Sequence, residues 1–507
     1  MNVMVVVDWM AIRPNHLKIE KDETKIEIID LCTPLSITIT TMKQMIDRLG
    51  KILPCYPTTT NDDQIEPLLV NVPPSRLTNV ELQRRQSGVY LATMHVIDLN
   101  PMIPSFTREK YHLYFNEGFM GRLKVDQSIV DFNYTRLNIF LRLLSYQQIR
   151  VFNLHPNDVA VIEEKEYPCL LEFFLQFDPH LFYMKTCSFR YARPRTLQEG
   201  LFCLNEPEAR YDLTACGNCA LCYPKYSMKY HLKPSIVDFN AGHRHRFVNG
   251  YEVILNASAT CHTRNIIYVL TCPCGQVDYI GATGQSLHDR LKTHREHGNR
   301  IIHEFLLGQT NILRDAPRMK TSEIIRKDRM KLYQHSARCS HAMQIFLDAN
   351  PQYWRFIPMT IDESMKPEQT NIHRPVLSDE INMQYRTKED AIVCMDAVPG
   401  PPTNYVFSNR QIVLQTQYFH QNRDKTLPNM NIDLFRATII AVLPDECSDM
   451  FRNTIEALFV TYAESQLNTF GNVLIEEAQI NENPMYNPWF LREGTWCQGL
   501  LRRPQPK

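Results

Sequence analysis

The chain has 507 residues, of which 44% are hydrophobic, and its 55 Lys and Arg residues balance 55 Asp and Glu residues. This composition indicates a soluble globular protein of three or four domains. The net charge of zero excludes any inference about a partner from total charge, so only the local distribution of charge is informative.

The beginning of the chain does not predict secretion or membrane insertion. MNVMVVVDWM lacks a basic region and reaches Asp8 before a long apolar run has formed, so no signal peptide is expected. No segment reaches the roughly 18 apolar residues that crossing a bilayer requires. We therefore expect an intracellular protein that does not contact a membrane.

Residues 1–200 alternate short β-rich runs with helical ones and predict a separate N-terminal α/β region of unknown role. A polymerase would need paired aspartates after an aromatic residue to hold its two metal ions. The only Asp-Asp pair, Asp62-Asp63, follows Thr60 and Asn61 in a polar stretch. We therefore expect no polymerase activity.

Residues 201–262 are predicted to form a Cys/His-rich linker that holds zinc. Fifteen cysteines inside a cell favour free thiols and metal ligands over disulfides. C-x2-C spacing places two sulfurs within one turn of chain, as zinc sites require. We expect one Zn²⁺ on Cys219, Cys222 and Cys261, with Cys216, another cysteine or a nearby histidine as fourth ligand. The alternative is a set of reduced cysteines without metal.

A β-hairpin and a helix are predicted next. Asn265–Thr271 and Val277–Ile280 are rich in β-branched and aromatic residues, and Pro273-Cys274-Gly275 supplies a tight turn between them. Ser286 and Asp289 form a capping box, which predicts that a helix begins near Ser286.

Basic residues and histidines gather on this helix and beyond it. Arg290, His294 and His297 fall at i, i+4 and i+7 and so share one helical face. From residue 281 to residue 338 there are twelve Lys and Arg residues against six Asp and Glu residues. Such a stretch suits a phosphate backbone, although a solvated helical face would have the same composition. Further along, Cys339 and His341 form a C-x-H pair that we interpret as structural.

The order of these features resembles the GIY-YIG nuclease module, in which two strand motifs precede a helix with an Arg and a His, here Ile266-Ile267-Tyr268, Tyr279-Ile280-Gly281, Arg290 and His294. The resemblance is closest to the version in Penelope-like retroelements, where a Cys/His linker precedes the module and a Cys-x-Cys-Gly turn joins the strands, and it covers about residues 185–300. Ile266 departs from the family's Gly, a change that a strand interior tolerates. The resemblance implies an α/β (α+β) fold, with a small, mainly antiparallel three-stranded sheet flanked by helices.

The same resemblance implies a Glu on a helix after a third strand, with an Asn downstream. Arg436–Leu443 followed by Glu456 and Asn468 fits this order, and we prefer it. It makes residues 263–345 the first part of the nuclease core, 346–432 an insertion, and 433–507 the completing strand and helix with a tail. The alternative uses Trp354–Met359 as the strand and Glu389 as the ligand.

The implied activity is hydrolysis of phosphodiester bonds in DNA by a retroelement-derived endonuclease with a single Mg²⁺ or Mn²⁺, in the nucleus. A catalytically silent nucleic-acid-binding protein with the same fold is the alternative. The implied catalytic residues are Tyr268, Tyr279, Arg290, His294 and Glu456, the last of which holds the metal with Glu389 as alternative. The implied substrate-binding residues are Gly281, Lys292, Arg295, His297 and Asn468.

Overall fold

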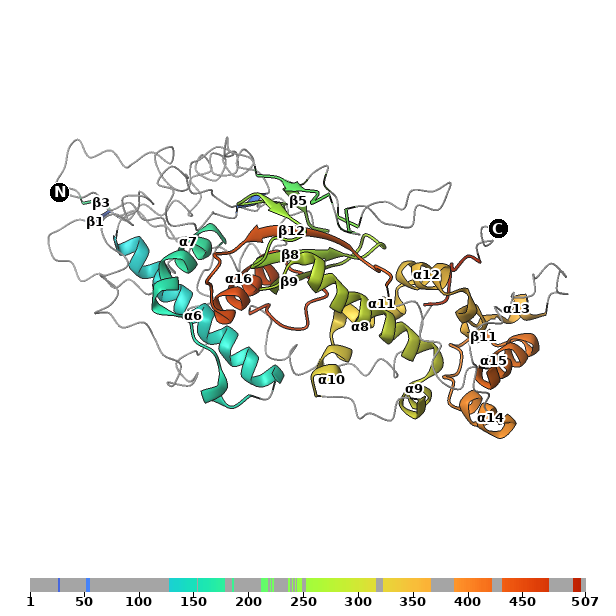
Figure 1. Cartoon of the computed structure of the whole chain (residues 1–507). Helices are drawn as coiled ribbons and strands as arrows, with labels where there is room; N and C mark the ends of the chain where they lie inside the picture. Colours follow the sequence, from blue (N-terminus) through green and yellow to red (C-terminus); the bar gives the residue numbers. More distant parts are fainter. Residues whose placement is uncertain are drawn as a thin grey trace. The chain divides into compact units, whose positions relative to one another are not determined.

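The computed structural model of the chain describes residues 26–27, 52–54, 127–152, 154–177, 185–186, 211–217, 219, 221–222, 236–237, 239, 242, 244–248, 252–315, 322–365, 387–421, 431–473 and 496–502. These residues form helices and small sheets, as the predicted α+β class requires (Figure 1). The Asp62-Asp63 pair lies outside the described residues. Among the described helices, none has both the length and the apolar character needed to cross a membrane.

The chain divides into two compact units. The first unit comprises Met1–Leu270, Asp278–His288 and Ala437–Ile475, and the second comprises Thr271–Val277, Asp289–Arg436 and Glu476–Lys507.

Helices and short strands of the first unit precede and follow its central sheet. Its described elements are β1 (Ile26–Glu27), β2 (Ile52–Pro54), α6 (Gln127–Phe152), η3 (Pro156–Asp158), η4 (Glu164–Glu166), α7 (Tyr167–Phe177), β3 (Lys185–Thr186), β4 (Leu213–Thr214), β5 (Arg244–Arg246), β6 (Glu252–Ile254), β7 (Ala259–Thr260), β8 (Ile266–Thr271), β9 (Asp278–Thr283), β12 (Arg436–Val442) and α16 (Asp449–Tyr462).

The central sheet has three strands in the order β12-β8-β9. A backbone bond from the Leu443 N–H to the Asn265 carbonyl (2.7 Å) joins the end of β12 to the start of β8. The predicted hairpin and third strand are therefore confirmed. The predicted helix after the third strand is also present, because Ser448 caps α16 by accepting a hydrogen bond from the Phe451 N–H.

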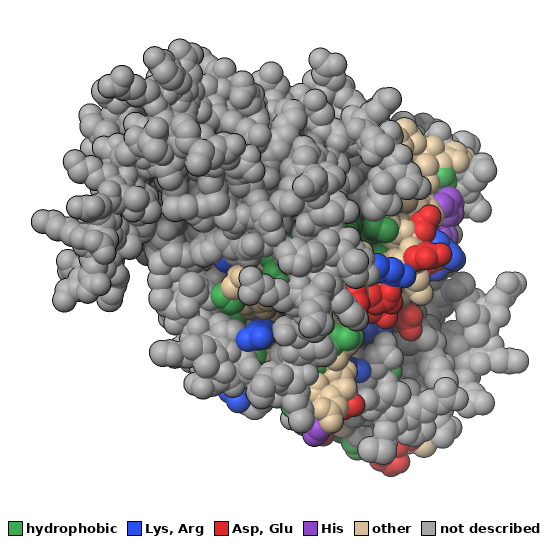
Figure 2. Space-filling model, turned by 90° about the vertical axis from the view of Figure 1, so that its left-hand side faces the viewer, with side chains coloured by type: hydrophobic (Ala, Val, Ile, Leu, Met, Phe, Trp, Pro, Cys, Tyr) green, Lys and Arg blue, Asp and Glu red, His purple; other side chains and the backbone are tan. Residues whose placement is uncertain are grey.

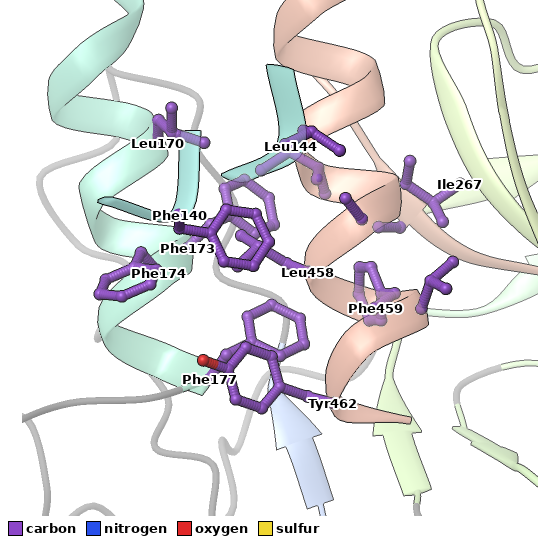
Figure 3. Close-up of a cluster of buried hydrophobic side chains, with 14 of the residues drawn as sticks. Phe140, Leu144, Leu170, Phe173, Phe174, Phe177, Ile267, Leu458, Phe459 and Tyr462 are labelled. Carbon is purple, nitrogen blue, oxygen red and sulfur yellow. The ribbon is translucent and has the colours of Figure 1, made fainter. Parts of the chain in front are cut away.

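The hydrophobic core lies between this sheet and the helices α6, α7 and α16 (Figure 3). Ile267 and Val269 of β8 and Ile280 of β9 are fully buried in it. Phe173 and Phe177 of α7 lie edge-on against aromatic rings of α16, with ring centroids 6.4 Å and 4.9 Å from those of Phe451 and Phe459.

This packing differs from the separate N-terminal region that we predicted for residues 1–200. Helices α6 and α7 belong to the same compact unit as the sheet. The reason is that α16 has buried apolar residues on more than one side, including Ala457, Val460 and Phe459. A helix of this kind needs a second layer to cover it, and α6 and α7 supply that layer.

The second unit is largely helical. Its described elements are the part of α8 (Leu287–Leu307) from residue 289 onward, α9 (Gln309–Asp315), α10 (Ser322–Asp328), α11 (Lys331–Arg338), α12 (Ser340–Ala349), η5 (Pro351–Phe356), β10 (Met359–Thr360), α13 (Ile361–Ser364), α14 (Lys388–Asp396), β11 (Tyr405–Val406) and α15 (Asn409–Gln421).

The strand predicted over Trp354–Met359 is wrong. The first half of that stretch, Trp354–Phe356, belongs to the 3₁₀ helix η5, whose first residue is Pro351, and only Met359 enters a strand. Tyr353 and Phe356, three residues apart, are both buried on one side of this helix. The side chain of Gln415 on α15 donates to the Arg355 carbonyl, and that of Gln411 donates to the Ile357 carbonyl. Tertiary packing therefore determines the conformation here.

Candidate active site and metal centres

The two motif tyrosines lie together in the first unit around one glycine. Tyr268 of β8 is fully buried, Tyr279 of β9 is 5% exposed, and their ring centroids are 6.4 Å apart. A Cβ atom on Gly281 would lie 2.6 Å from the Tyr268 hydroxyl and 2.9 Å from a ring carbon of Tyr279. Real Cβ contacts are not this short, so residue 281 must be glycine for the two rings to keep these positions.

Glu456 reaches the same stretch of β9 from α16. One of its carboxylate oxygens, Oε2, accepts a hydrogen bond of 2.9 Å from the Ala282 N–H. Ala282 directly follows Gly281, so the carboxylate and both tyrosines meet around two consecutive residues. Glu456 is half-buried, which leaves part of its side chain accessible to solvent. The structure therefore brings Tyr268, Tyr279 and Glu456 together around β9.

Asn468 also binds β9, through its whole side-chain amide. Its oxygen accepts from the Ile280 N–H (2.9 Å), and its nitrogen donates to the Ile280 carbonyl (2.7 Å). The hydroxyl of Ser465 donates to the same amide oxygen (2.7 Å). The buried side chain thus pairs with β9 as a neighbouring strand would, and in this arrangement it positions the strand between Tyr279 and Gly281.

Arg452 lies one helical turn before Glu456 and was not among the predicted residues. It donates to the Asn265 side chain (3.1 Å) and the Cys447 carbonyl (2.8 Å), and it forms an ion pair with Asp449. Its guanidinium carbon lies 3.4 Å from the position of a Cβ on Gly284, in the turn after β9. The sequence signal that could have identified Arg452 is its i, i+4 spacing to Glu456 on the same helix.

The predicted histidines of α8 lie in the interior of the second unit. His294 and His297 are buried, and the Nδ1 atom of His294 lies 3.0 Å from the Tyr333 hydroxyl. Burial, together with the charge of Arg290, lowers the pKa of His294 well below its ordinary value. Burial likewise lowers the pKa of His297 to about 4. Both imidazoles are therefore neutral at pH 7 and are weak bases.

Several of the basic side chains after residue 281 are neutralised by acidic partners in the second unit. Half-buried Arg290 belongs to this unit as well, and Lys292 is exposed. Ion pairs join Lys292 to Asp289 at 2.9 Å, Arg295 to Asp433 at 2.6 Å, and Arg300 to Glu304 at 2.8 Å and to Asp328. On the face of the molecule that Figure 2 draws, the charged side chains of the described residues are likewise of both signs. The expected basic stretch is therefore mixed in charge, and the ion pairs of Arg295 and Arg300 are largely buried, with side chains that are at most 18% exposed.

Glu389, the alternative metal ligand, occupies the first turn of α14 and is exposed. The helix is capped by Thr387, whose hydroxyl accepts from the Asp390 N–H (3.2 Å). An acidic residue at this position is stabilised by the positive end of the helix dipole. The surroundings of Glu389 are those of an ordinary residue near a helix N-terminus.

A first group of metal-ligating side chains, here named the linker cluster, consists of Cys216, Cys219, Cys222 and Cys261 of the first unit. Their sulfurs all lie within 4.8 Å of one another, and the sulfur of Cys261 is 3.2 Å from that of Cys219 and 3.1 Å from that of Cys222. Four thiolates around one Zn²⁺ would place their sulfurs about 3.8 Å apart. The structure therefore brings the predicted ligands together and provides Cys216 as the fourth.

The cysteines of the linker cluster are not paired in disulfides. Burial raises the pKa of Cys222 and of Cys261, which favours protonated thiols in the absence of a cation. A divalent cation would reverse this preference, because zinc binds thiolates. The donor set thus fits a structural zinc ion.

A second group, here named the turn cluster, consists of Cys272, Cys274, His335 and Cys339 of the second unit. The Nε2 atom of His335 lies 3.1 Å from the Cys272 sulfur and 3.7 Å from the Cys274 sulfur, and the sulfurs of Cys272 and Cys339 are 3.5 Å apart. The interpretation of Cys339 as part of a structural pair with His341 therefore needs correction. Cys339 is instead the N-cap residue of α12, and its sulfur lies beside that of Cys272 in the hairpin turn.

The turn cluster combines two short patterns, C-x-C at residue 272 and H-x3-C at residue 335. Either pattern alone is weak evidence for a metal, and together they supply the four ligands of a Cys₃His zinc site.

Comparison of the chain with family models, with curated proteins and with solved structures finds no match. In the part of the chain that the structure describes, the protein is therefore an α+β protein with two Cys/His clusters that can bind a metal such as zinc.

Proposed function

We propose that the chain is a GIY-YIG-type endonuclease that hydrolyses phosphodiester bonds in DNA with one divalent metal ion, and that it derives from a retroelement. One observation carries the proposal. Glu456 binds the Ala282 N–H beside Tyr268 and Tyr279, although the two bonded residues are 174 positions apart in the chain. The motif order in the sequence assigns the same three side chains to one site.

Glu456 suits a hard cation that takes few protein ligands. Mg²⁺ and Mn²⁺ prefer oxygen, and Mg²⁺ in phosphate chemistry is bound by one or two carboxylates, water and the substrate. A half-buried carboxylate that keeps part of its surface in solvent meets this requirement. When bound, the cation would supply charge neutralisation at the scissile phosphate and a more acidic water.

The chain's own residues would then position the reactants. Tyr268, whose phenol is a poor base at an ordinary pKa near 10, would orient the attacking water rather than deprotonate it unaided. Tyr279 would lie against the phosphate. The motif implies that Arg290 would neutralise the charge that develops there. His294, which is buried and neutral, would keep the start of α11 in place through Tyr333.

Zinc in the two clusters would have a structural role. The linker cluster would fix the segment around Cys219 to the chain just before β8, and the turn cluster would fix the hairpin turn to α11 and α12. Closed sites with four protein ligands are typical of structural zinc, because no position is left for substrate.

A silent nucleic-acid-binding protein is the second candidate. The observation that favours it is the complete burial of the Tyr268 side chain, which keeps the phenol away from a substrate phosphate unless the site opens. The two functions differ in one measurable property, since a silent module binds DNA without cutting it.

The test is nicking of supercoiled plasmid by the zinc-loaded protein in Mg²⁺, beside Glu456→Gln, Glu389→Gln and Arg290→Ala. We expect nicking by the wild type and by Glu389→Gln, the matched carboxylate control. Loss of about 100-fold or more is expected in Glu456→Gln and in Arg290→Ala, because each removes charge stabilisation from the transition state. DNA binding without nicking by the wild type would show that the chain is the silent module.

A further inference from the structure

Cys261 holds two parts of the first unit at once. Its sulfur belongs to the linker cluster, and its backbone carbonyl accepts a hydrogen bond of 3.0 Å from the His288 N–H. His288 is the second residue of α8. The side chain of one fully buried residue thus lies in a metal-ligating cluster while its backbone binds the beginning of a long helix.

This backbone bond satisfies a group that the helix cannot satisfy itself. The first N–H groups of any α-helix lack a partner within the helix, so something outside it must accept their hydrogen bonds. Here a carbonyl 27 positions earlier in the chain does so for His288. The ring of His262, next to Cys261, also lies 5.3 Å from the ring of His288.

The segment around Cys261 is too constrained for its sulfur and carbonyl to move independently. Thr260 and Thr263 enclose it in a turn, with the Thr263 N–H donating to the Thr260 carbonyl (3.0 Å) and the Thr260 N–H donating to the Thr263 hydroxyl (2.9 Å). Just before the turn, β7 pairs with β4, which leads to the other three cysteines. A shift of the cluster would therefore move the carbonyl that binds α8.

We propose that metal occupancy of the linker cluster fixes the first turn of α8 through the Cys261 carbonyl, and so regulates the nuclease. The regulatory part rests on the proposed function, because Arg290 follows His288 by two residues on the same helix. With the metal bound, the four sulfurs hold Cys261 and the first turn is ordered. Without it, the thiols separate and the beginning of α8 frays.

The test measures hydrogen–deuterium exchange of the peptide that contains His288, in the full chain, together with nicking in excess Mg²⁺. Cys216→Ser disables the linker cluster at its most accessible ligand, and Cys274→Ser disables the turn cluster as a matched control. We expect exchange about tenfold faster, with a parallel loss of nicking, in Cys216→Ser, since one backbone hydrogen bond at the helix end is lost. Cys274→Ser should leave exchange at His288 unchanged.

A pair of substitutions at His288 tests the hydrogen bond itself. His288→Pro removes the N–H at a position in the first turn where proline is tolerated, whereas His288→Ala removes the ring and keeps the N–H. The first-turn amides of His288→Pro should exchange at the same rate with zinc and after its removal by a chelator, and those of His288→Ala should respond to zinc as the wild type does.

Equal exchange at His288 in zinc-loaded and zinc-free wild type would overturn the proposal. A zinc-dependent first turn in a protein whose nicking ignores zinc would overturn its regulatory part. A wild type that never nicks DNA would refute the proposed function alone, because the exchange measurement does not depend on catalysis.

Discussion

Removal of the Asn468 amide should loosen β9 next to the candidate active site. In Asn468→Ala, the Ile280 N–H and carbonyl both lose their partner, and Ser465 loses an acceptor. An unsatisfied buried backbone group costs about 1–3 kcal/mol. Two such groups, partly rehydrated, should therefore destabilise β9 by roughly 2–3 kcal/mol, which corresponds to opening that is about 30- to 150-fold more frequent.

Hydrogen–deuterium exchange of the β9 peptide measures this opening directly. Asn453→Ala, at a half-exposed asparagine of α16, is the matched control and should leave β9 protection unchanged. Asn468→Asp separates the two bonds, because a carboxylate can accept from the Ile280 N–H but cannot donate to the Ile280 carbonyl. If β9 in Asn468→Ala exchanged at the wild-type rate, the inference that this amide positions the strand would be wrong.

Three further predictions concern other parts of the chain. Gly281→Ala should destabilise the first unit by about 1–3 kcal/mol in urea unfolding, because its Cβ would overlap the Tyr268 hydroxyl, while Gly400→Ala, where a Cβ meets nothing within 4 Å, should not. Zinc analysis of purified protein should find about two ions per chain, and Cys339→Ser should retain about one; a metal-free wild type with intact folding would contradict both clusters. Burial lowers the pKa of His303 to about 3 in the folded chain. As the pH falls, His303 therefore takes up a proton in the unfolded chain at a higher pH than in the folded chain. Stability should thus be constant above about pH 6.5 and decrease below it by up to about 1.4 kcal/mol per pH unit for this group, a slope that His303→Gln should reduce.

The sequence predicted those elements whose patterns are local. The β-rich runs around Tyr268 and Tyr279 and the turn between them each depend on a few adjacent residues, and the structure contains all of them. The position of Glu456 relative to β9 was also predictable, because strand β12 and helix α16 follow each other in the order that the motif requires. Local patterns and motif order were sufficient there.

Partners across long chain separations were less predictable. An apolar helix face shows that something covers it but does not identify what does, so the packing of Phe173 on Phe451 had no sequence signal. The turn cluster joins Cys272 and His335, which are 63 positions apart, and each half of its pattern is weak alone. At Trp354 the β-rich composition suggested a strand. The chain forms a 3₁₀ helix there instead, which buries Tyr353 and Phe356, three residues apart, on one side.

The affinity of the zinc-loaded protein for Mn²⁺, measured by electron paramagnetic resonance with a short DNA duplex present, distinguishes Glu456 from Glu389 as the metal ligand. We expect a bound Mn²⁺ whose affinity falls by about tenfold or more in Glu456→Gln and stays unchanged in Glu389→Gln, because Glu456 binds β9 beside the two tyrosines. Unchanged Mn²⁺ affinity in Glu456→Gln, or a loss confined to Glu389→Gln, would contradict this expectation.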